Sequence, residues 1–360
     1  MNKKLLAAAV VAAVAASPAA FADSTVYGKL HTSIDYNDFD KNKNWSVESR
    51  ASRLGFKGSE DLGGGLKAIY QIEFGISSDG GDQQTNANTG PRTPVNNHRN
   101  TFIGLAGDWG TALVGRHDTP MKMAFYASGN ERLGDSAIDL NRGASVLGVF
   151  QEVRASNAIA YVSPNFSGFT VAAAIIPGEE FDGLSTGPTV SGGYNPTGVK
   201  ASDGLADHYS FGAMYSGNGL KASAGYEVLD NQAGGISAGA GNNDMKTWQL
   251  GASYTMNAFS FGGEYQNTKD FGFVDGRDYD AWALTGKWTM GNNAIAAVYT
   301  NSKDKRAAGD WKTDGWGLSG EHNFSKRSKV YSAYAYNKEK RPVLDDVKDQ
   351  VFSLGMIHNF

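Results

Sequence analysis

The chain has 360 residues, a formal net charge of −4, a pI near 5.9, and 41% hydrophobic and 19% charged residues. This balance has no basic excess of the kind that binds a phosphate backbone, so we expect no nucleic-acid partner. Because the chain contains no cysteine, disulfides, thiolate zinc clusters and haem-attachment motifs are excluded, and a metal site would need histidine or carboxylate ligands.

Residues 1–22 are predicted to be a cleaved signal peptide. Lys3 and Lys4 precede an apolar run of 12 residues, Leu5–Ala16, and Ala20-Phe21-Ala22 has the small-x-small pattern found before a cleavage site. The run is too short to cross the membrane as a helix, which takes roughly 20 residues. Cleavage removes two of the 33 basic residues and none of the 37 acidic ones, so the exported chain, residues 23–360, carries a net charge of −6.

Most of the exported chain alternates between apolar and small polar residues with a period of two, as half-buried strands do. In the first segment one face carries Val26, Leu30 and Ile34, and the other carries His31 and Asp35. Similar alternation recurs at 220–228, 248–254, 259–266 and 316–324. A soluble sandwich alternates in the same way, so this pattern alone leaves both a sandwich and a membrane barrel open.

The lengths of the connections distinguish the two folds. Seven short turns are predicted at 60–65, 107–110, 164–168, 216–219, 257, 291–293 and 325–328. They alternate with eight long polar segments near 37–44, 78–97, 118–153, 177–207, 229–246, 268–279, 301–313 and 337–349. Short turns at one end and long loops at the other are typical of outer-membrane barrels. We therefore predict an all-β fold, a transmembrane antiparallel barrel of sixteen strands, which is wide enough to enclose water.

The last predicted strand ends at the aromatic residue Phe360, with Phe352, Leu354, Met356 and His358 on the same face. Barrel closure removes exposed sheet edges. We expect this strand to pair with the first one.

Several stretches are similar to the Gram-negative trimeric general-diffusion porins. Ser52–Ala68 resembles the second hairpin of that family, and three further stretches agree in order. These are Phe102–Leu105 with Gly110 and Gly115-Arg116, then Arg154 with Asn157 and Tyr161–Phe169, and finally His358–Phe360. The resemblance spans 23–360 and implies a homotrimer in the outer membrane of a Gram-negative bacterium. It also implies that the third external loop, residues 118–153, folds into the lumen as a constriction.

The resemblance also implies which charges line that constriction. The basic wall is assigned to Arg53, Arg99 and Arg154, with Arg116 beside them, and Glu73 matches an acidic position near that cluster. The loop itself contains Glu131, Asp135 and Asp139, which are expected to line the acidic side. Alternation independently places Arg53 and Arg154 toward the lumen, and Arg116 as well if Leu113 faces lipid. Arg99 is too close to a loop for alternation to place it. The loop lacks a Pro-Glu-Phe-Gly motif, so the conformation of its tip does not carry over from enteric relatives.

Three motif-like stretches are interpreted as coincidences. Gly183–Gly187 and Gly235–Gly239 match Gly-x-Ser-x-Gly but lie in predicted loops without the strand and helix of a nucleophile elbow. Gly315–Gly320 matches Gly-x-Gly-x-x-Gly but lies within a predicted strand. Asp38 and Asp40 resemble the start of a calcium loop that then departs from the pattern, which leaves weak loop binding of Ca²⁺ open. No catalytic residue, metal site or cofactor is predicted.

These observations predict an outer-membrane porin, a water-filled channel for small hydrophilic solutes and ions, whose other partners are membrane lipid and two further copies of itself. The alternatives are a substrate-selective channel and a non-conducting adhesin barrel. If the arginines cluster at the waist, we expect a weak preference for anions, because rings of charge set ion preference.

Overall fold

The computed structural model describes residues 23–40, 42–79, 95–178, 204–230 and 243–360. The first strands are β1 (Asp23–Phe39), β2 (Asn42–Ser49), β3 (Arg53–Gly63), β4 (Leu66–Ile76), β5 (Val95–Gly107) and β6 (Gly110–Asp118). After helix α2 (Pro120–Ala127) come β7 (Arg154–Val162), β8 (Phe169–Ile176), β9 (His208–Gly217), β10 (Leu220–Leu229), β11 (Met245–Met256) and β12 (Phe259–Lys269). A 3-10 turn, η2 (Phe271–Phe273), precedes β13 (Tyr279–Met290), β14 (Asn293–Asp304), β15 (Trp311–Asn323), β16 (Ser328–Lys340) and β17 (Val347–Asn359). Within the described part of the chain, no helix is both long and apolar enough to cross a membrane.

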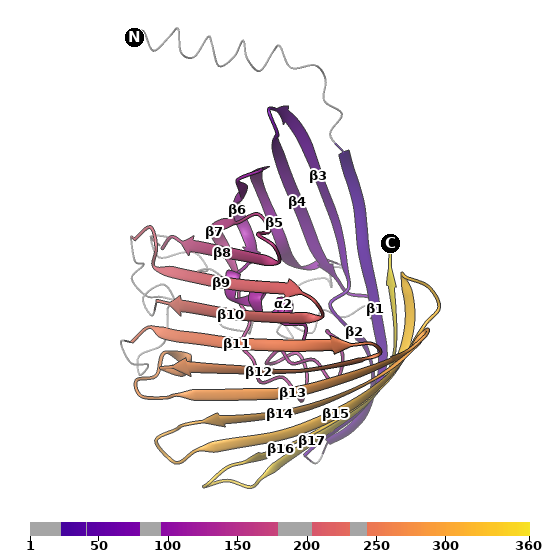
Figure 1. Ribbon diagram of the computed structural model, residues 1–360. Helices are drawn as coiled ribbons and strands as arrows, with labels where there is room; N and C mark the ends of the chain where they lie inside the picture. The colour runs from indigo at the N-terminus through magenta and orange to yellow at the C-terminus, as the bar shows by residue number, and fades with distance from the viewer. Residues whose placement is uncertain (1–22, 41, 80–94, 179–203, 231–242) are drawn as a thin grey trace.

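The strands form one antiparallel sheet that closes on itself (Figure 1). Strand β17 pairs with β1 along Lys29–Phe39, and the remaining strands pair with their neighbours around the ring. Strands β2 and β3 pair with successive parts of β1, namely Thr32–Phe39 and Asp23–Lys29. The two therefore act as a single interrupted strand, and the predicted sixteen-stranded barrel is confirmed.

The interruption between β2 and β3 lies at residues 50–52, where side-chain contacts replace the regular backbone hydrogen bonds to β1. Ala51 has a positive φ of 46°. The Ser52 hydroxyl accepts a hydrogen bond from the His31 amide at 2.9 Å and donates one to the His31 carbonyl oxygen at 3.1 Å, while Arg50 forms an ion pair with Asp35. These side chains satisfy backbone groups and a buried charge that the break would otherwise leave unpaired.

The first external connection differs from the prediction. A long loop near 37–44 was expected because these residues are polar, but β1 and β2 continue as a paired hairpin to Phe39 and Asn42. Strand β1 is also paired with β17 as far as Phe39, so the sheet itself continues through these polar residues. The polarity of this segment was therefore wrongly interpreted as a loop.

The predicted alternation is confirmed. Val26 and Ile34 are more than half exposed on the outer face of the isolated chain, whereas His31 and Asp35 are fully buried inside the barrel. All seven predicted turns lie between paired strands. The closure of the barrel is completed by reciprocal backbone hydrogen bonds of 3.1 Å between Gly28 and Phe360.

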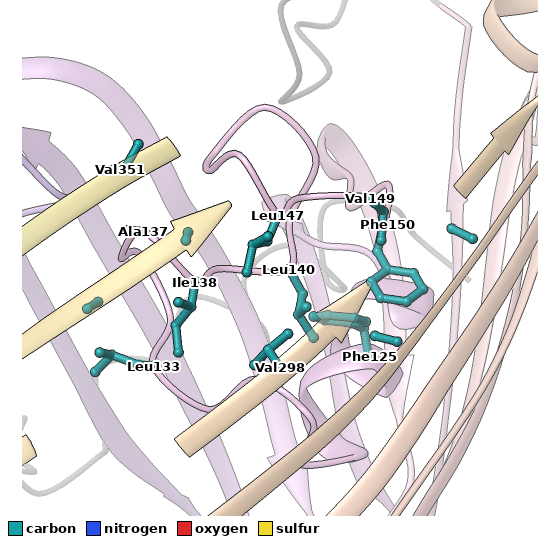
Figure 2. Packing of buried hydrophobic residues seen from close by; sticks show 14 of the residues in the cluster. Phe125, Leu133, Ala137, Ile138, Leu140, Leu147, Val149, Phe150, Val298 and Val351 are labelled. Carbon is teal, nitrogen blue, oxygen red and sulfur yellow. The ribbon is translucent and has the colours of Figure 1, made fainter. Parts of the chain in front are cut away.

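The lumen loop, residues 119–153, packs against the inner wall of the barrel. Helix α2 contacts β9, β10 and β11, and Figure 1 shows it inside the ring of strands. Apolar residues of the helix and of the loop after it form the main buried cluster together with inward-facing residues of β13, β14, β16 and β17 (Figure 2). The loop contributes Phe125, Leu133, Ala137, Ile138, Leu140, Leu147, Val149 and Phe150. This core fixes the loop across the lumen.

Inward-facing glycines make room for the loop. A Cβ atom added at Gly317 would lie 2.6 Å from Ile138 and 2.7 Å from Leu147, and one at Gly315 would lie 2.8 Å from Leu147. Gly315–Gly320 lies within β15, as predicted. The first glycines of this dinucleotide-like stretch provide space for packing.

Candidate functional site

Helix α2 begins the lumen loop with a regular cap. The Thr119 side chain accepts a hydrogen bond from the Lys122 amide, and Pro120 occupies the first helical position, where its missing N–H leaves no donor unpaired. The helix places the Lys122 ammonium between two carboxylates, 3.5 Å from Asp118 and 3.3 Å from Glu152. Lys122 and Glu152 are both buried, so this ion pair anchors the two ends of the loop to each other.

Asn130 connects the loop to the wall. Its side-chain amide donates to the Gly263 carbonyl oxygen at 2.7 Å and to Glu264 at 2.9 Å, and its amide oxygen accepts from the Thr285 hydroxyl at 3.1 Å. Asn130 is fully buried. Because this buried amide forms hydrogen bonds with three wall residues, it fixes the position of the loop at Asn130.

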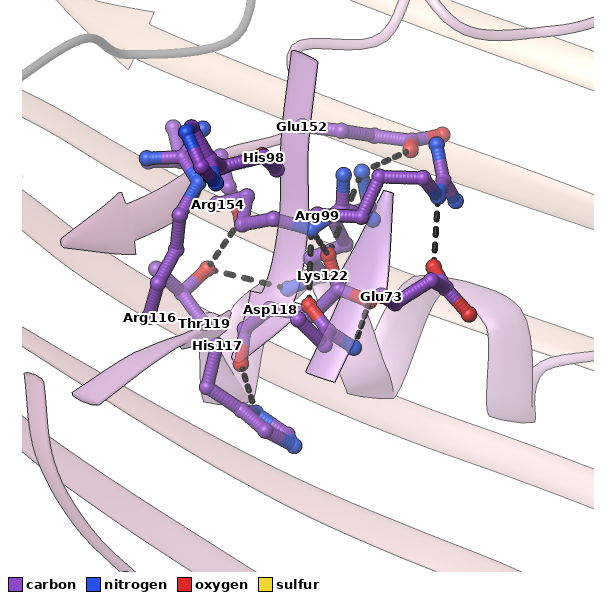
Figure 3. Close-up of polar contacts among 12 residues, drawn as sticks. Glu73, His98, Arg99, Arg116, His117, Asp118, Thr119, Lys122, Glu152 and Arg154 are labelled. Carbon is purple, nitrogen blue, oxygen red and sulfur yellow. Dashed lines mark hydrogen bonds and ion pairs between the residues drawn. The ribbon is translucent and has the colours of Figure 1, made fainter. Parts of the chain in front are cut away.

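A chain of polar side chains connects β4–β7 with the base of the loop (Figure 3). Glu73 accepts from Arg99 at 2.5 Å and from the Tyr27 hydroxyl at 2.8 Å. Because Glu73 and Arg99 come from neighbouring strands and little of either is exposed, each neutralises the other where a single charge would be costly.

Next to this pair lies a second carboxylate, Asp118. Its Oδ1 atom is 2.8 Å from Nε of Arg154, and its Oδ2 atom accepts from the Asn100 amide at 3.2 Å. Arg154 is buried and also donates to Asn100 at 2.7 Å. Figure 3 shows this group continuous with Lys122 and Glu152, so the wall and the base of the loop share one polar network.

The tip of the loop meets the wall directly. The Lys29 ammonium, on β1, lies 2.7 Å from the Asp135 carboxylate. Asp135 has a positive φ of 61°, a conformation that aspartate tolerates in turns. Burial alone would raise the pKa of the Asp135 carboxyl, but the Lys29 charge outweighs it and lowers that pKa. Arg53 faces Lys29 in the strand register, and within the described residues its side chain forms no ion pair or hydrogen bond.

Arg116 has different neighbours from the other predicted arginines. It donates to the His98 carbonyl oxygen at 2.9 Å and to the Ser156 hydroxyl at 2.7 Å. The assumption that placed it, an outward Leu113, is wrong, because Leu113 is buried and Val114 is exposed. Gly115, with a φ of 135°, accompanies a register shift that breaks the alternation at this point.

Two of the predicted loop carboxylates lie within the loop's own packing. Asp139 accepts from the backbone amides of Asp135 at 2.5 Å and Asn141 at 2.6 Å, and Glu131 accepts from the Leu140 amide at 3.1 Å. Burial, reinforced by the Asp135 charge, raises the pKa of Asp139 to about 7. Burial and the neighbouring Asp139 raise the pKa of Glu131 well above its ordinary value. Both carboxylates therefore hold the loop's shape.

This arrangement predicts a pH dependence of stability. A carboxyl whose pKa is higher in the folded state than in the unfolded state stabilises the fold when protonated, and that stabilisation is lost as pH rises toward the folded pKa. For Asp139 the interval runs from its ordinary value of 3.8 to about 7. We expect the unfolding temperature of the wild type to fall relative to that of Asp139→Asn across this interval and to run parallel to it at higher pH. A constant difference at every pH would contradict the assignment.

Four residues that complete the site were not among the predicted ones: Lys29, Asp118, Lys122 and Glu152. Lys29 was indicated by its position on the inward face of the first strand. Asp118 and Lys122 are four residues apart at the start of a helix, a spacing that brings side chains together. Nothing in the sequence indicates their contact with Glu152, which depends on the return of the loop.

The remaining motif-like stretches add no further chemistry to this site. Gly183–Gly187 and Gly235–Gly239 lie outside the described residues. Asp38 forms an ion pair with Lys43 at 3.1 Å and accepts from Gln350 at 2.9 Å. In the described part of the chain, no group of three histidine, aspartate or glutamate side chains is arranged to hold a metal ion.

Comparison with known proteins identifies the family. The model of the Gram-negative porin family matches residues 7–342. Outer membrane porin protein 32 of Delftia acidovorans is 30% identical over 287 residues, which cover 75% of this chain and 70% of that protein. An outer membrane porin protein of Bordetella pertussis is 26% identical over 298 residues, which cover 78% of this chain and 72% of that protein.

Solved structures share the fold. The anion-selective porin from Comamonas acidovorans superimposes with a TM-score of 0.69 at 23% identity, covering 94% of this chain and 100% of that one. The trimer form of OmpT from Vibrio cholerae gives 0.64 at 17% identity, covering 94% and 99%. OmpF of Salmonella typhi gives 0.67 at 14% identity, covering 94% and 97%. The chain therefore belongs to the Gram-negative porin family and is an outer-membrane channel for the passive diffusion of small hydrophilic solutes and ions.

Proposed function

We propose that this porin works as a homotrimer and that its waist, between the lumen loop and the wall of β1 and β3–β5, favours anions weakly. The observation that carries the proposal is the state of the charges at the waist. The cationic side chains that we assign to the waist are Lys29, Arg53, Arg99, Arg116, Lys122 and Arg154, and the carboxylates paired with them are Glu73, Asp118, Asp135 and Glu152. Asp139 is buried and Glu131 is half-buried within the loop, so the two compensate little of the excess.

Arg53 is the cation we expect to act on permeating ions. The charges of Lys29, Arg99 and Arg154 are each balanced by a carboxylate within 2.8 Å, whereas Arg53 is partly exposed and has no such partner among the described residues. An uncompensated charge beside a narrow aqueous path concentrates counter-ions there. The acidic external loops act less, because salt screens charge beyond about 8–10 Å.

Arg53→Gln tests the selectivity. We expect the reversal potential in a salt gradient to shift toward cations, with conductance nearly unchanged, because the variant keeps the size of the side chain and removes its charge. Lys326→Gln is the matched control, because it removes an equal charge from the exposed short turn between β15 and β16, away from the waist. A strongly cation-selective wild type that Arg53→Gln leaves unaltered would refute the proposal and indicate control by the loop carboxylates.

The trimer is supported by the family and by the trimer form of the OmpT neighbour. The outer face of β8 carries Val171, half exposed in the single chain, with the small residue Ala173 beside it. Such a face is able to pack against another subunit as well as against lipid. We expect the purified protein to migrate as a trimer on a gel when unheated and as a monomer after heating. Migration as a monomer in both samples would contradict the trimer.

A further inference from the structure

A cavity of about 570 Å³ lies above the waist, at the end of the barrel that carries the longer loops. It is lined by residues 142–149 of the lumen loop and by the inner faces of β13–β17, β1 and β2. This volume lies within the range of small-molecule sites, about 300–1,000 Å³. The charges around it are distributed unevenly, and this distribution indicates what the cavity binds.

One side of the cavity is cationic. The Arg142 guanidinium lies over the rings of Phe271 and Tyr279, 4.3 and 4.9 Å from their centroids, and within the described residues it has no carboxylate partner. Arg306 also lines the cavity and lies 2.8 Å from the Asp304 carboxylate, which it shares with Arg277. Two guanidinium groups, those of Arg142 and Arg306, thus line this side with one carboxylate, and the aromatic rings hold Arg142 in place without neutralising it.

The other side is acidic. Four carboxylates line it: Asp35, Glu48, Glu339 and Asp349. Arg50 and Arg341 neutralise two of them in ion pairs. Glu48 and Asp349 belong to no ion pair within the described part of the chain. This side therefore carries an excess of negative charge, opposite the positive charge of Arg142.

The order of the strands separates the two charges. Arg142 and Arg306 lie beside β13, β14 and the start of β15, whereas the four carboxylates lie on β16, β17, β1 and β2, which follow around the ring. We propose that this cavity is a binding subsite for small zwitterions, such as amino acids and short peptides. The solute's carboxylate binds at Arg142 and its ammonium binds at Glu48 and Asp349, before the solute reaches the waist.

The test uses the complete channel in planar bilayers, with glycylglycine added on the external side. Acetate and methylammonium, which carry one charge each, are the comparison probes. We expect glycylglycine to produce saturable current fluctuations that the single-charge probes produce only at much higher concentration. Arg142→Gln and Glu48→Gln should each weaken the apparent affinity about two- to fivefold, the range for solvent-exposed ion pairs. Lys326→Gln, which lies far from the cavity, should leave the affinity unchanged.

Arg142→Gln and Glu48→Gln change different parts of the protein, so a folding defect in one of these variants would not by itself decide the result. Arg142 belongs to the lumen loop, and Glu48 belongs to the barrel wall on the opposite side of the cavity. The subsite is refuted if glycylglycine acts no differently from acetate or methylammonium, or if both variants bind it as tightly as Lys326→Gln does. The reversal potential of Arg142→Gln separates this site from the waist, because a change in dipeptide affinity without a change in ion selectivity supports the subsite alone.

Discussion

Gly317→Val is expected to displace the lumen loop from the wall and to increase both the single-channel conductance and the size limit for solutes. The added side chain would begin with a Cβ atom 2.6 Å from Ile138 and 2.7 Å from Leu147, far inside van der Waals contact. Overpacking of this kind costs about 1–3 kcal/mol. Strand β15 is held by ladders to β14 and β16 along its length, whereas the loop docks through side chains, so the loop is the part that moves.

The same strand offers a matched control. Gly320 belongs to the outward-facing alternation of β15, and a Cβ atom there would meet only the Ser332 hydroxyl, at 3.6 Å. Gly320→Val therefore adds the same side chain to the same strand without touching the loop. Liposome swelling with sugars of increasing size measures the limit for both variants. Equal limits for Gly317→Val, Gly320→Val and the wild type would show that the glycine does not position the loop.

Lys122→Met is expected to lower the stability of the docked loop by about 3–5 kcal/mol, the cost of removing one partner from a buried ion pair. Glu152 would remain as a buried carboxylate with only the Tyr126 hydroxyl and the Asn141 amide as donors. Asp118 would still be compensated by Arg154. The loss should appear as a lower temperature of conversion to the heat-modified gel band and as increased noise in the open-channel current.

A double variant distinguishes loss of charge pairing from loss of packing. Glu152→Gln removes the uncompensated charge and keeps an acceptor for Tyr126, so adding it to Lys122→Met should recover part of the stability. The coupling energy from this double-mutant cycle isolates the pair. If the double variant is as unstable as the sum of the single ones, Lys122 acts through its methylene packing, and the anchoring role of its charge is wrong.

The barrel could be predicted from the sequence because its determinants are local and periodic. The alternation of Val26 and Ile34 with His31 and Asp35, repeated along the chain, separates an outer apolar face from an inner polar one. Turn residues then fix the strand ends. The errors arose where periodicity fails: at 37–44, where the sheet continues through polar residues, and at Arg116, where the register shifts beside Gly115.

The constriction depended on tertiary structure. Carboxylates at 131, 135 and 139 look equivalent in the sequence, but the fold aims Asp135 at Lys29 and turns Glu131 and Asp139 into the loop's own backbone. The contacts between the loop and the barrel wall join residues more than 100 positions apart, such as Asn130 with Gly263 and Leu147 with Gly317. Local patterns determine which face of each strand is wet. Long-range packing decides which charges remain unpaired in the lumen. The reason is that a loop without a periodic pattern takes its conformation from the barrel wall against which it packs.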